Sequence, residues 1–351
     1  MANKSARLGD LATYINGYAF KPADWGDTGL PIIRIQDLTG NSYQLNRYDG
    51  EYPERIEVND GDVLISWSAS LGVYVWQHGK ALLNQHIFKV VFDKLPVNKD
   101  YFVFAVEQKL AEMESKTHGA TMKHIVKKDF DGTTIPYPPI EKQAEIADHL
   151  RRITSLIDRQ TEQLLLLDQL VKSRFIELFG DPVLNQHGWR KVALEVNATL
   201  LNGRAYKQDE LLDSGKYPVL RVGNFFSNRG WYYSDLELDD DKYCDNGDLL
   251  YAWSASFGPQ IWNGGKVIYH YHIWKVLVGE AYNKQFLCKL LEYATESLMG
   301  DTHGIAMMHL TKSGMEKTEF IVPPIERQEQ FAAFVEQTDK SKLCGRMEVA
   351  A

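Results

Sequence analysis

The sequence predicts an α+β chain in which two tandem, mainly β domains are separated by long helices that pair as an antiparallel coiled coil. The decapeptide GDVLISWSAS, which begins at Gly61, recurs as GDLLYAWSAS from Gly247, and the segments around both copies recur as well. Between the copies, residues 140–179 contain neither glycine nor proline. A helix of that length needs a partner helix, because one amphipathic helix cannot bury its apolar seam alone.

Length and composition are those of a globular protein with two ordinary domains. The chain has 351 residues, of which 44% are hydrophobic and 25% charged, values that argue against disorder. Its three cysteines include no Cys-x-x-Cys pair, which excludes a disulfide framework and a cysteine-type zinc site. The net charge of −8 argues against a protein that coats nucleic acid indiscriminately, but it allows a local basic surface.

The repeat covers most of each half of the chain. NGYAFK pairs with NGRAYK, LPIIRIQDL with YPVLRVGNF, HIFKV with HIWKV, THGATMKH with THGIAMMH, and PPIEKQ with PPIERQ, all shifted by 185–187 positions. A period this long is typical of a duplicated domain rather than of a solenoid. Short runs such as LPIIRI, DVLISW, GVYVW and NQHIFKVVF predict strands joined by turns. One helix is predicted in each copy, at 101–115 and 284–299.

The central helix is predicted at 140–179. Pro138 and Pro139 precede it, and Gly180 and Pro182 end it. An apolar residue recurs every seven positions, which is a coiled-coil seam over about five heptads. The seam residues, which we expect to bind partners, are Leu150, Ile157, Leu164, Val171 and Leu178.

A second, shorter helix is predicted after PPIERQ. Its seam runs through Phe331 and Val335, and it then reaches the polar residues Thr338 and Lys342. We therefore expect the second helix to cover only part of the first and to leave apolar surface for other chains.

Basic and short polar side chains form the candidate contacts to nucleic acid. The segment Lys116–Lys128 carries four lysines and two histidines without an acid, which suits a loop lying on phosphates, although a solvated loop is the alternative. In WSAS the tryptophans Trp67 and Trp253 are predicted to pack in the core or on the domain surface, whereas the flanking serines are small enough to approach a groove. Asn84 and Gln85 suit base edges, because both amides can bond adenine in two places.

The two copies differ at the proposed base readers, where NQH at 84–86 corresponds to HYH at 270–272. We expect residues shared by the copies to build the scaffold or hold phosphate, and residues that differ to read bases; unconstrained surface is the alternative. The candidate DNA-binding residues are Tyr18, Lys21, Arg34, Ser68, Ser70, Asn84, Gln85, His86, His118, Thr121, Lys123, Lys127, Arg204, Lys207, Arg221, Ser254, Ser256, His270, His272, His303, His309 and Lys312.

No catalytic motif stands out. The sequence has no phosphate-binding loop that ends in Gly-Lys-Ser/Thr, no Gly-x-Ser-x-Gly and no His-Glu-x-x-His. His270 and His272 lie two apart and are predicted to share one face of a strand; a metal pair is the alternative, but no carboxylate or cysteine lies nearby to complete it. We therefore predict a chain without catalytic residues and without a metal site.

The central region resembles that of the specificity (S) subunit of type I restriction–modification enzymes. The resemblance rests on the PPIEKQ entry, on the leucine-rich helix, and on the exit KSRFIELFGDP at Lys172–Pro182. IVPPIERQEQFAAFV resembles the family's distal conserved region, and the two GD…WSAS strands resemble those of its target-recognition domains. One departure is that CGRMEVAA does not continue the distal heptad.

The resemblance implies two target-recognition domains, at 1–139 and 182–322, a central conserved helix at 140–181 and a short distal helix at 323–351. It implies that each domain reads one half of a bipartite double-stranded DNA target and that the helices set the gap. The implied partners are two methyltransferase subunits and, in addition, restriction subunits; S-adenosylmethionine, Mg and ATP would belong to those partners and not to this chain.

Two other functions remain open from the sequence. One is a duplicated protein-binding adaptor with a coiled-coil spacer, and the other is a nuclease or methyltransferase whose motif is hidden in the β domains. Because no run approaches about 18 apolar residues and the N-terminal segment lacks a signal-peptide core, we expect a cytoplasmic protein with no membrane contact.

Overall fold

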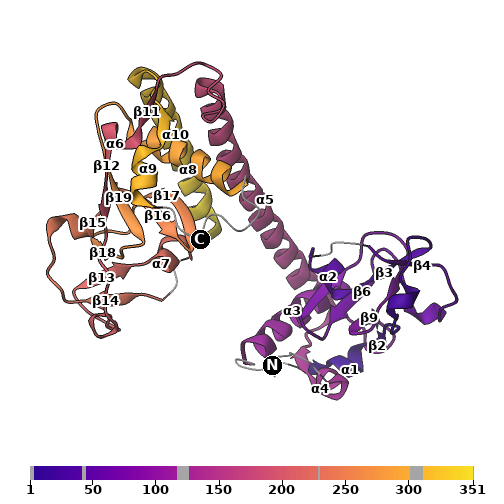
Figure 1. The fold of residues 1–351 in the computed structure, drawn as a ribbon. Helices are drawn as coiled ribbons and strands as arrows, with labels where there is room; N and C mark the ends of the chain where they lie inside the picture. The colour runs from indigo at the N-terminus through magenta and orange to yellow at the C-terminus, as the bar shows by residue number, and fades with distance from the viewer. Residues whose placement is uncertain (1–3, 42–44, 117–125, 228–229, 301–310, 351) are drawn as a thin grey trace. The chain divides into compact units, whose positions relative to one another are not determined.

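The computed structural model describes residues 4–41, 45–116, 126–227, 230–300 and 311–350 and divides into two units, Met1–Ile157 and Asp158–Ala351 (Figure 1). The elements of the first unit are β1 (Ser5–Arg7), α1 (Leu8–Leu11), β2 (Thr13–Asn16), β3 (Leu30–Ile33), α2 (Ile35–Leu38), β4 (Arg47–Tyr48), β5 (Glu57–Val58), β6 (Val63–Ser66), β7 (Gly72–Val75), β8 (Ala81–Leu83), β9 (Ile87–Val91), α3 (Lys99–Lys116), α4 (Lys127–Gly132) and β10 (Thr134–Pro136).

The long helix α5 (Ile140–Phe179) begins in the first unit and ends in the second. The remaining elements are β11 (Lys191–Ala193), α6 (Leu194–Asn197), β12 (Ala198–Asn202), β13 (Tyr217–Leu220), α7 (Val222–Ser227), β14 (Tyr232–Ser234), β15 (Tyr243–Cys244), β16 (Leu249–Ser254), β17 (Ser256–Ile261), β18 (Val267–Tyr269), β19 (Ile273–Val278), α8 (Lys284–Gly300), α9 (Lys312–Lys317), β20 (Glu319–Ile321) and α10 (Ile325–Ala350).

The sheet order is the same in both units. The first unit has sheets β2-β9-β6-β7, β4-β3-β8-β5 and β1-β10, and the second has β12-β19-β16-β17, β14-β13-β18-β15 and β11-β20. In each, one pair is parallel, β3 with β8 and β13 with β18, and the other paired strands run antiparallel. The duplication predicted from the sequence is therefore a duplication of topology.

The strand that carries the repeated decapeptide is buried on both faces. Val63 and Ile65 of β6 pack in one core with α3, and Leu64 packs in a second core with the β4-β3-β8-β5 sheet. Successive side chains of a strand point to opposite faces, so a sheet that is covered on both sides needs an unbroken apolar run. The apolar runs VLI of the first copy and LLY of the second therefore mark the central layer of each unit.

The glycine at the start of the repeat is required by backbone geometry. Gly61 and Gly247 have φ of 89° and 87°, a region that residues with a Cβ rarely adopt. The next residue closes the turn, because the Asp62 carboxylate accepts the Asn59 N–H at 2.9 Å and the Asp248 carboxylate accepts the Asp245 N–H at 2.9 Å. The Gly-Asp pair thus sets the entry to the central strand in both copies.

A buried glutamine attaches each long helix to the unit it leaves. The Gln143 side chain donates to the Pro138 carbonyl at 2.9 Å and accepts the Asn98 N–H, just before α3, at 2.9 Å. Gln328 repeats this at the start of α10, where it donates to the Pro323 carbonyl at 2.8 Å and accepts the Asn283 N–H at 2.8 Å. The shared Pro-Pro-Ile-Glu-x-Gln motif is therefore a polar joint between helix and domain.

The apolar seam of α5 differs from the predicted one. Val171 is 3% exposed, but Phe175 and Phe179 share its core, whereas the sequence seam continues to Leu178, which is only partly buried. Ile157 is 44% exposed, and Leu150 and Leu164 are half-buried. The aromatic pair replaces the heptad in the last turns because it packs against Phe286 and Phe331 of the second unit.

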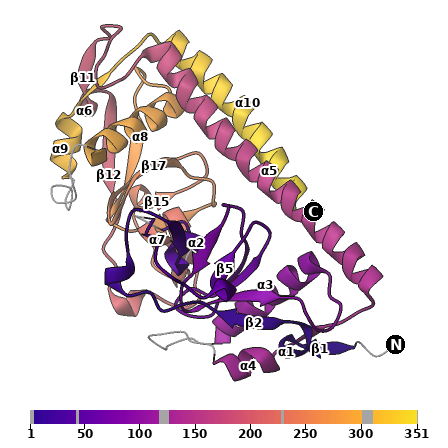
Figure 2. The ribbon, with the colours of Figure 1, turned by 90° about the vertical axis from the view of Figure 1, so that its right-hand side faces the viewer.

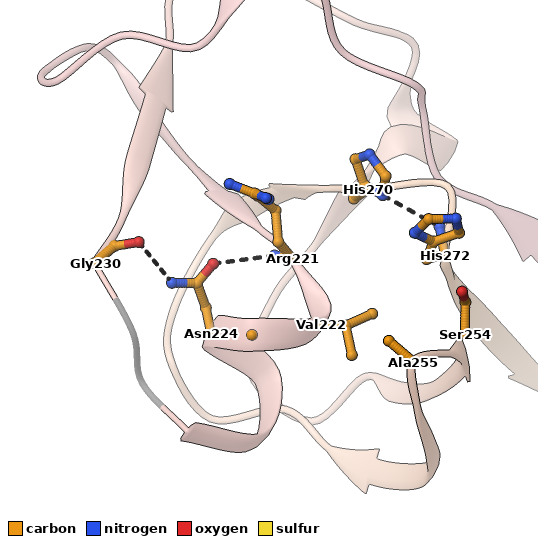
Figure 3. Close-up of a pocket in the computed structure, with 9 residues that line it drawn as sticks. Arg221, Val222, Asn224, Gly230, Ser254, Ala255, His270 and His272 are labelled. Carbon is orange, nitrogen blue, oxygen red and sulfur yellow. Dashed lines mark hydrogen bonds between the residues drawn. The ribbon is translucent and has the colours of Figure 1, made fainter. Parts of the chain in front are cut away.

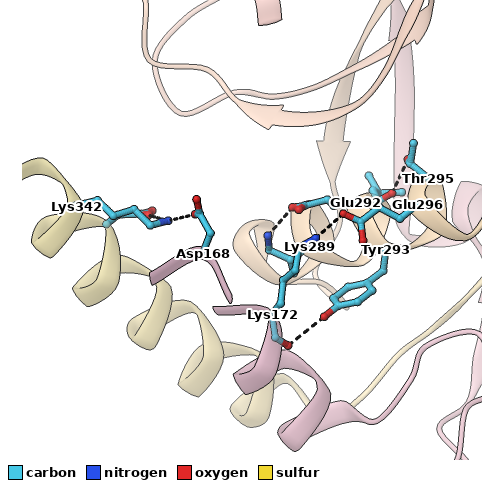
Figure 4. Close-up of polar contacts among 10 residues, drawn as sticks. Asp168, Lys172, Lys289, Glu292, Tyr293, Thr295, Glu296 and Lys342 are labelled. Atoms are coloured by element: carbon cyan, nitrogen blue, oxygen red, sulfur yellow. Dashed lines mark hydrogen bonds and ion pairs between the residues drawn. The ribbon is translucent and has the colours of Figure 1, made fainter. Parts of the chain in front are cut away.

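The helix α10 lies alongside the last part of α5 in the opposite direction (Figure 2). Arg327, near its start, donates to the Leu178 carbonyl at 3.3 Å, and Lys342 lies 2.7 Å from the Asp168 carboxylate (Figure 4). The predicted seam positions Phe331, Val335 and Thr338 are buried. The antiparallel pairing is thus confirmed, and the polar seam residues are accommodated by local partners.

The sequence predicted the larger elements and missed the smallest. The helices expected at 101–115, 140–179 and 284–299 correspond to α3, α5 and α8, and Gly180 follows α5 with φ of 72°. The strand pairs β1-β10 and β11-β20 were not predicted, because three-residue strands carry too little pattern. Among the described residues, no helix has the length and apolarity needed to span a membrane.

Candidate nucleic-acid interface

One turn in each unit gathers the candidate residues. In the first unit it joins β8 to β9 and contains Asn84, Gln85 and His86. The Tyr18 N–H donates to the Leu83 carbonyl at 2.8 Å, and the Gln85 N–H donates to the Tyr18 carbonyl at 2.9 Å. The segment after β2 is therefore held against this turn by main-chain bonds, independently of the Tyr18 side chain.

The second unit repeats the arrangement with other side chains. The Arg204 N–H donates to the Tyr269 carbonyl at 3.0 Å, and the Tyr271 N–H donates to the Arg204 carbonyl at 3.0 Å. Gly17 and Gly203, which precede these segments, lie so close to the turn that a Cβ would collide with its main chain. The repeated Asn-Gly pair is thus explained by close backbone approach.

Two further segments converge on the same turn. In the first unit, the Asn84 N–H donates to the Ile33 carbonyl at 3.1 Å and the Trp67 N–H donates to the His86 carbonyl at 3.3 Å. The corresponding bonds of the second unit join His270 to Leu220 at 2.9 Å and Trp253 to His272 at 3.0 Å. These bonds bring Arg34 and Arg221, at the starts of α2 and α7, and both WSAS segments to the turn.

Both WSAS turns hold an alanine in the left-handed region. Ala69 has φ of 61° and Ala255 has φ of 66°, a conformation that costs about 1–3 kcal/mol in residues other than glycine. Ser70 and Ser256 next to them are exposed, Ser254 is half-buried, and Ser68 is only 5% exposed. Ser70 and Ser256 are therefore better placed than Ser68 for a contact outside the chain.

The two tryptophans of WSAS pack as predicted. Trp67 stacks on Phe88 with ring centroids 5.6 Å apart, and Trp253 stacks on Trp274 at the same 5.6 Å. Each also meets the histidine that ends the turn edge-on, His86 at 5.0 Å and His272 at 5.2 Å. The histidine shared by the copies is thus fixed by an aromatic neighbour.

The two histidines of HYH are not on a strand, which corrects the sequence prediction. His270 and His272 lie in the turn between β18 and β19, with ring centroids 4.8 Å apart. Burial, and then His272 and Arg221, lower the pKa of His270 to about 4, and burial lowers the pKa of His272. Across the described segments, no three His, Cys, Asp or Glu side chains gather as metal ligands.

Several candidate cations already have partners within the chain. Arg204 pairs with both carboxylate oxygens of Glu210 at 2.7 and 2.8 Å, and this pairing lowers the pKa of Glu210 to about 2. Lys127 lies 2.7 Å from Asp131 and Lys312 lies 3.4 Å from Glu316. These cations therefore present less free charge than the sequence suggests.

Two candidate lysines, Lys21 and Lys207, are exposed and occupy equivalent positions before short 3-10 helices. The candidates of the two Thr-His-Gly loops lie outside the described residues: His118, Thr121, Lys123, His303 and His309. Which candidates contact DNA stays a prediction.

A pocket of about 370 Å³ opens beside the turn of the second unit (Figure 3). Candidates Arg221, Ser254, His270 and His272 line it, together with residues that the sequence did not single out, among them Asn224. The signal that could have identified Asn224 lies in the pairing of LPIIRIQDL with YPVLRVGNF, because the two copies differ in the residues that follow the shared arginine.

Comparison with known proteins identifies relatives of both halves. The family model of the type I restriction modification DNA specificity domain matches residues 3–167 and again 187–344. The EcoBI specificity subunit of Escherichia coli is 29% identical over 168 residues, which is 47% of this chain and 35% of that subunit. The MjaVIII specificity subunit of Methanocaldococcus jannaschii is 24% identical over 95% of this chain and 85% of its own length.

The fold also resembles a solved structure. The S subunit of a type I restriction–modification system from M. genitalium aligns with 99% of this chain and 92% of its own, with a TM-score of 0.61 and 13% identity. At that identity the likeness concerns the fold, and it extends over both units.

Proposed function

Because this chain belongs to the type I restriction modification DNA specificity family, we propose that it is the non-catalytic subunit that gives a DNA methyltransferase complex its sequence specificity. Each unit reads one half of a bipartite duplex target. The helices α5 and α10 set the spacing between the halves and dock the methyltransferase subunits.

The single observation that carries the proposal is the duplication of one site on one topology. In each unit, three segments are bonded to a turn whose middle side chain, Gln85 or Tyr271, is exposed and whose flanking polar side chains are half-buried. Two related readers in one chain suit two half-sites displaced along a duplex. A protein-binding adaptor would have no need for the same polar turn in both units.

The differences between the turns support two different half-sites. The first unit offers the amides Asn84 and Gln85, which suit adenine, and the second offers His270 and Tyr271 at the same positions. Because the surrounding main-chain bonds are the same, the exchange alters the side chains presented and leaves the scaffold in place.

The middle of α5 supports the docking of partner subunits. Ile153, Leu156 and Ile157 are 53%, 60% and 44% exposed, and further along Leu165 and Leu166 are also exposed. Apolar surface of this kind favours burial against another protein. We propose two methyltransferase subunits as those partners and restriction subunits beyond them, with S-adenosylmethionine, Mg and ATP held by the partners and the complex acting in the cytoplasm.

The test is to express the chain with the methyltransferase subunit of its own system and to map adenine methylation in a host that lacks it. The expected result is one split motif with a fixed gap. Expression of the methyltransferase without this chain is the control and should give no motif. A stable complex without any motif would contradict the proposal, and methylation by this chain alone would favour a hidden enzyme.

A further inference from the structure

The pocket of the second unit differs from most of the interface because it holds an exposed arginine. Figure 3 shows Arg221 at the start of α7, with Ser254 and Ala255 on the WSAS turn and His270 and His272 on the β18–β19 turn. The described residues that line it include no carboxylate. Among the described residues of this lining, Arg221 carries the positive charge at neutral pH, since burial lowers the pKa of both histidines.

The counterpart in the first unit, Arg34, is held by its own helix. Its side chain is 14% exposed, its Nε lies 3.3 Å from the Asp37 carboxylate, and it lies over the Trp25 ring at 5.8 Å. With its amide oxygen turned toward the guanidinium, Gln36 accepts from both terminal nitrogens, at 2.8 and 3.2 Å. The donor face of Arg34 is thus occupied from two sides.

Both of these side chains are replaced in the second unit. The alignment of LPIIRIQDL with YPVLRVGNF places Gly223 at the position of Gln36 and Asn224 at that of Asp37. Asn224 keeps the cap, since its oxygen accepts the Arg221 N–H at 3.3 Å, but its amide is neutral and donates to the Gly230 carbonyl at 3.2 Å. The fold of the turn is preserved while the charge that neutralises the arginine is removed.

The guanidinium of Arg221 is consequently accessible from outside the chain, and the residue three positions later does not neutralise its charge. Arg221 is exposed, its guanidinium lies 5.0 Å from the centre of the Tyr232 ring, and within the described parts of the chain no carboxylate forms an ion pair with it. Stacking on an aromatic ring restricts the orientation of the guanidinium without consuming its in-plane donors. Such a fork is suited to the two acceptors that guanine presents in the major groove.

We infer that Arg221 determines specificity by contacting a guanine in the half-site of the second unit, whereas Arg34 contacts no base. The inference rests on the proposed function and adds a base and a residue to it. The arginine at this shared position then contacts DNA in the second unit, whereas in the first unit it bonds only to residues of its own domain.

The experiment uses the complex of the chain with its methyltransferase subunit and duplexes that carry the mapped target. Each G·C pair of the second half-site is replaced singly, and the dissociation constant is measured for every duplex. Arg221→Ala is expected to weaken binding to the intact target roughly 10- to 100-fold. With this variant, the duplex that lacks the guanine should bind as well as the intact target, while discrimination at all other positions should match the unmodified chain.

Two further variants keep the test independent of folding. Asn224→Asp recreates the residue that neutralises Arg34 and retains the cap, so it should lose discrimination at the same guanine although the arginine is present. Arg34→Ala is the matched control in the first unit and should leave the preferred bases of both half-sites unchanged. Thermal unfolding of each variant shows whether the fold is retained, and Asn224→Asp carries the test if Arg221→Ala does not fold.

A different pattern would overturn the inference. If Arg221→Ala weakens binding to every duplex equally and lowers the salt dependence by about one unit, Arg221 contacts a phosphate and not a base. Loss of a base preference in the first half-site with Arg34→Ala would also reject the assignment. If the unmodified complex methylates no split motif, the proposed function itself fails, which is a separate result.

Discussion

The buried glutamine at the start of each long helix allows a quantitative prediction. Replacing Gln143 by Met keeps a similar volume and removes both hydrogen-bonding groups. The Asn98 N–H and the Pro138 carbonyl then lose their partner in a position where Gln143 is fully buried. An orphaned buried polar group costs about 1–3 kcal/mol, so the two together should lower the free energy of unfolding by roughly 2–6 kcal/mol.

The assay is urea unfolding of the full chain, with hydrogen exchange to locate the change. We expect the transition of the first unit to shift, and we expect faster exchange at the N-terminal ends of α3 and α5. The control is Gln163→Met, the same substitution at an exposed position of α5, which should change the free energy of unfolding by less than about 0.5 kcal/mol. Gln328→Met should produce the equivalent loss in the second unit.

The result that would refute the reasoning is equal stability of Gln143→Met and Gln163→Met. It would mean that Asn98 and Pro138 find other partners when the amide is removed, and that the motif does not join helix to domain through these bonds. A loss confined to partner binding, with unfolding unchanged, would likewise place the role of the motif outside this chain.

Three other perturbations follow from local geometry. Gly17→Ala should lower the free energy of unfolding by about 2–3 kcal/mol, because the added Cβ collides with the main chain of the turn. The control is Gly132→Ala, whose Cβ meets no atom and whose stability should lie within about 0.5 kcal/mol of the unmodified chain. Equal effects of the two substitutions would be evidence against the close approach. Ala69→Gly should cost less than about 0.5 kcal/mol by urea unfolding, because it relieves left-handed strain, while the exposed helical Ala144→Gly should cost about 1 kcal/mol. Because burial lowers the pKa of His270 from 6.5 to about 4, the unfolded chain binds that proton first, so stability should fall as the pH drops from 6.5 to about 4. The chain with His270→Gln should lack that part of the pH dependence, and an unchanged slope would assign it to other groups.

Most of the fold could be predicted because the sequence repeats it. Periodicity defined α5 and its antiparallel partner, and the repeated decapeptide marked the doubly covered strands β6 and β16. The packing of the last turns of α5 could not be predicted from the heptad. Phe175 and Phe179 face an aromatic core whose other members lie more than a hundred residues further on, and a local pattern carries no information about them.

The segments that form the candidate site could be predicted from the sequence, but the charges that the folded site leaves accessible could not. Gly-Asp, Asn-Gly and WSAS were identified as repeated. Main-chain bonds explain why the Asn-Gly and WSAS segments converge on the turn, whereas Gly-Asp sets the entry to the central strand. The sequence could not show that Arg204 is paired with Glu210, because an ion pair between residues six apart depends on the turn between them. It also placed His270 and His272 on a strand, since alternation of residue types does not distinguish a strand from a tight turn that follows one.

The two arginines at the helix starts show where comparison of the copies alone is insufficient. Arg34 and Arg221 are the same residue at the same place in the topology, so the repeat by itself assigns them the same role. The availability of a guanidinium, however, depends on the residue three positions later, where Asp37 is a charged acceptor and Asn224 a neutral one. Both cap the helix, so selection for the fold is satisfied by either. A change between them can therefore alter the charge offered to DNA without altering the scaffold, which is the kind of change that duplicated recognition domains need in order to read different sequences.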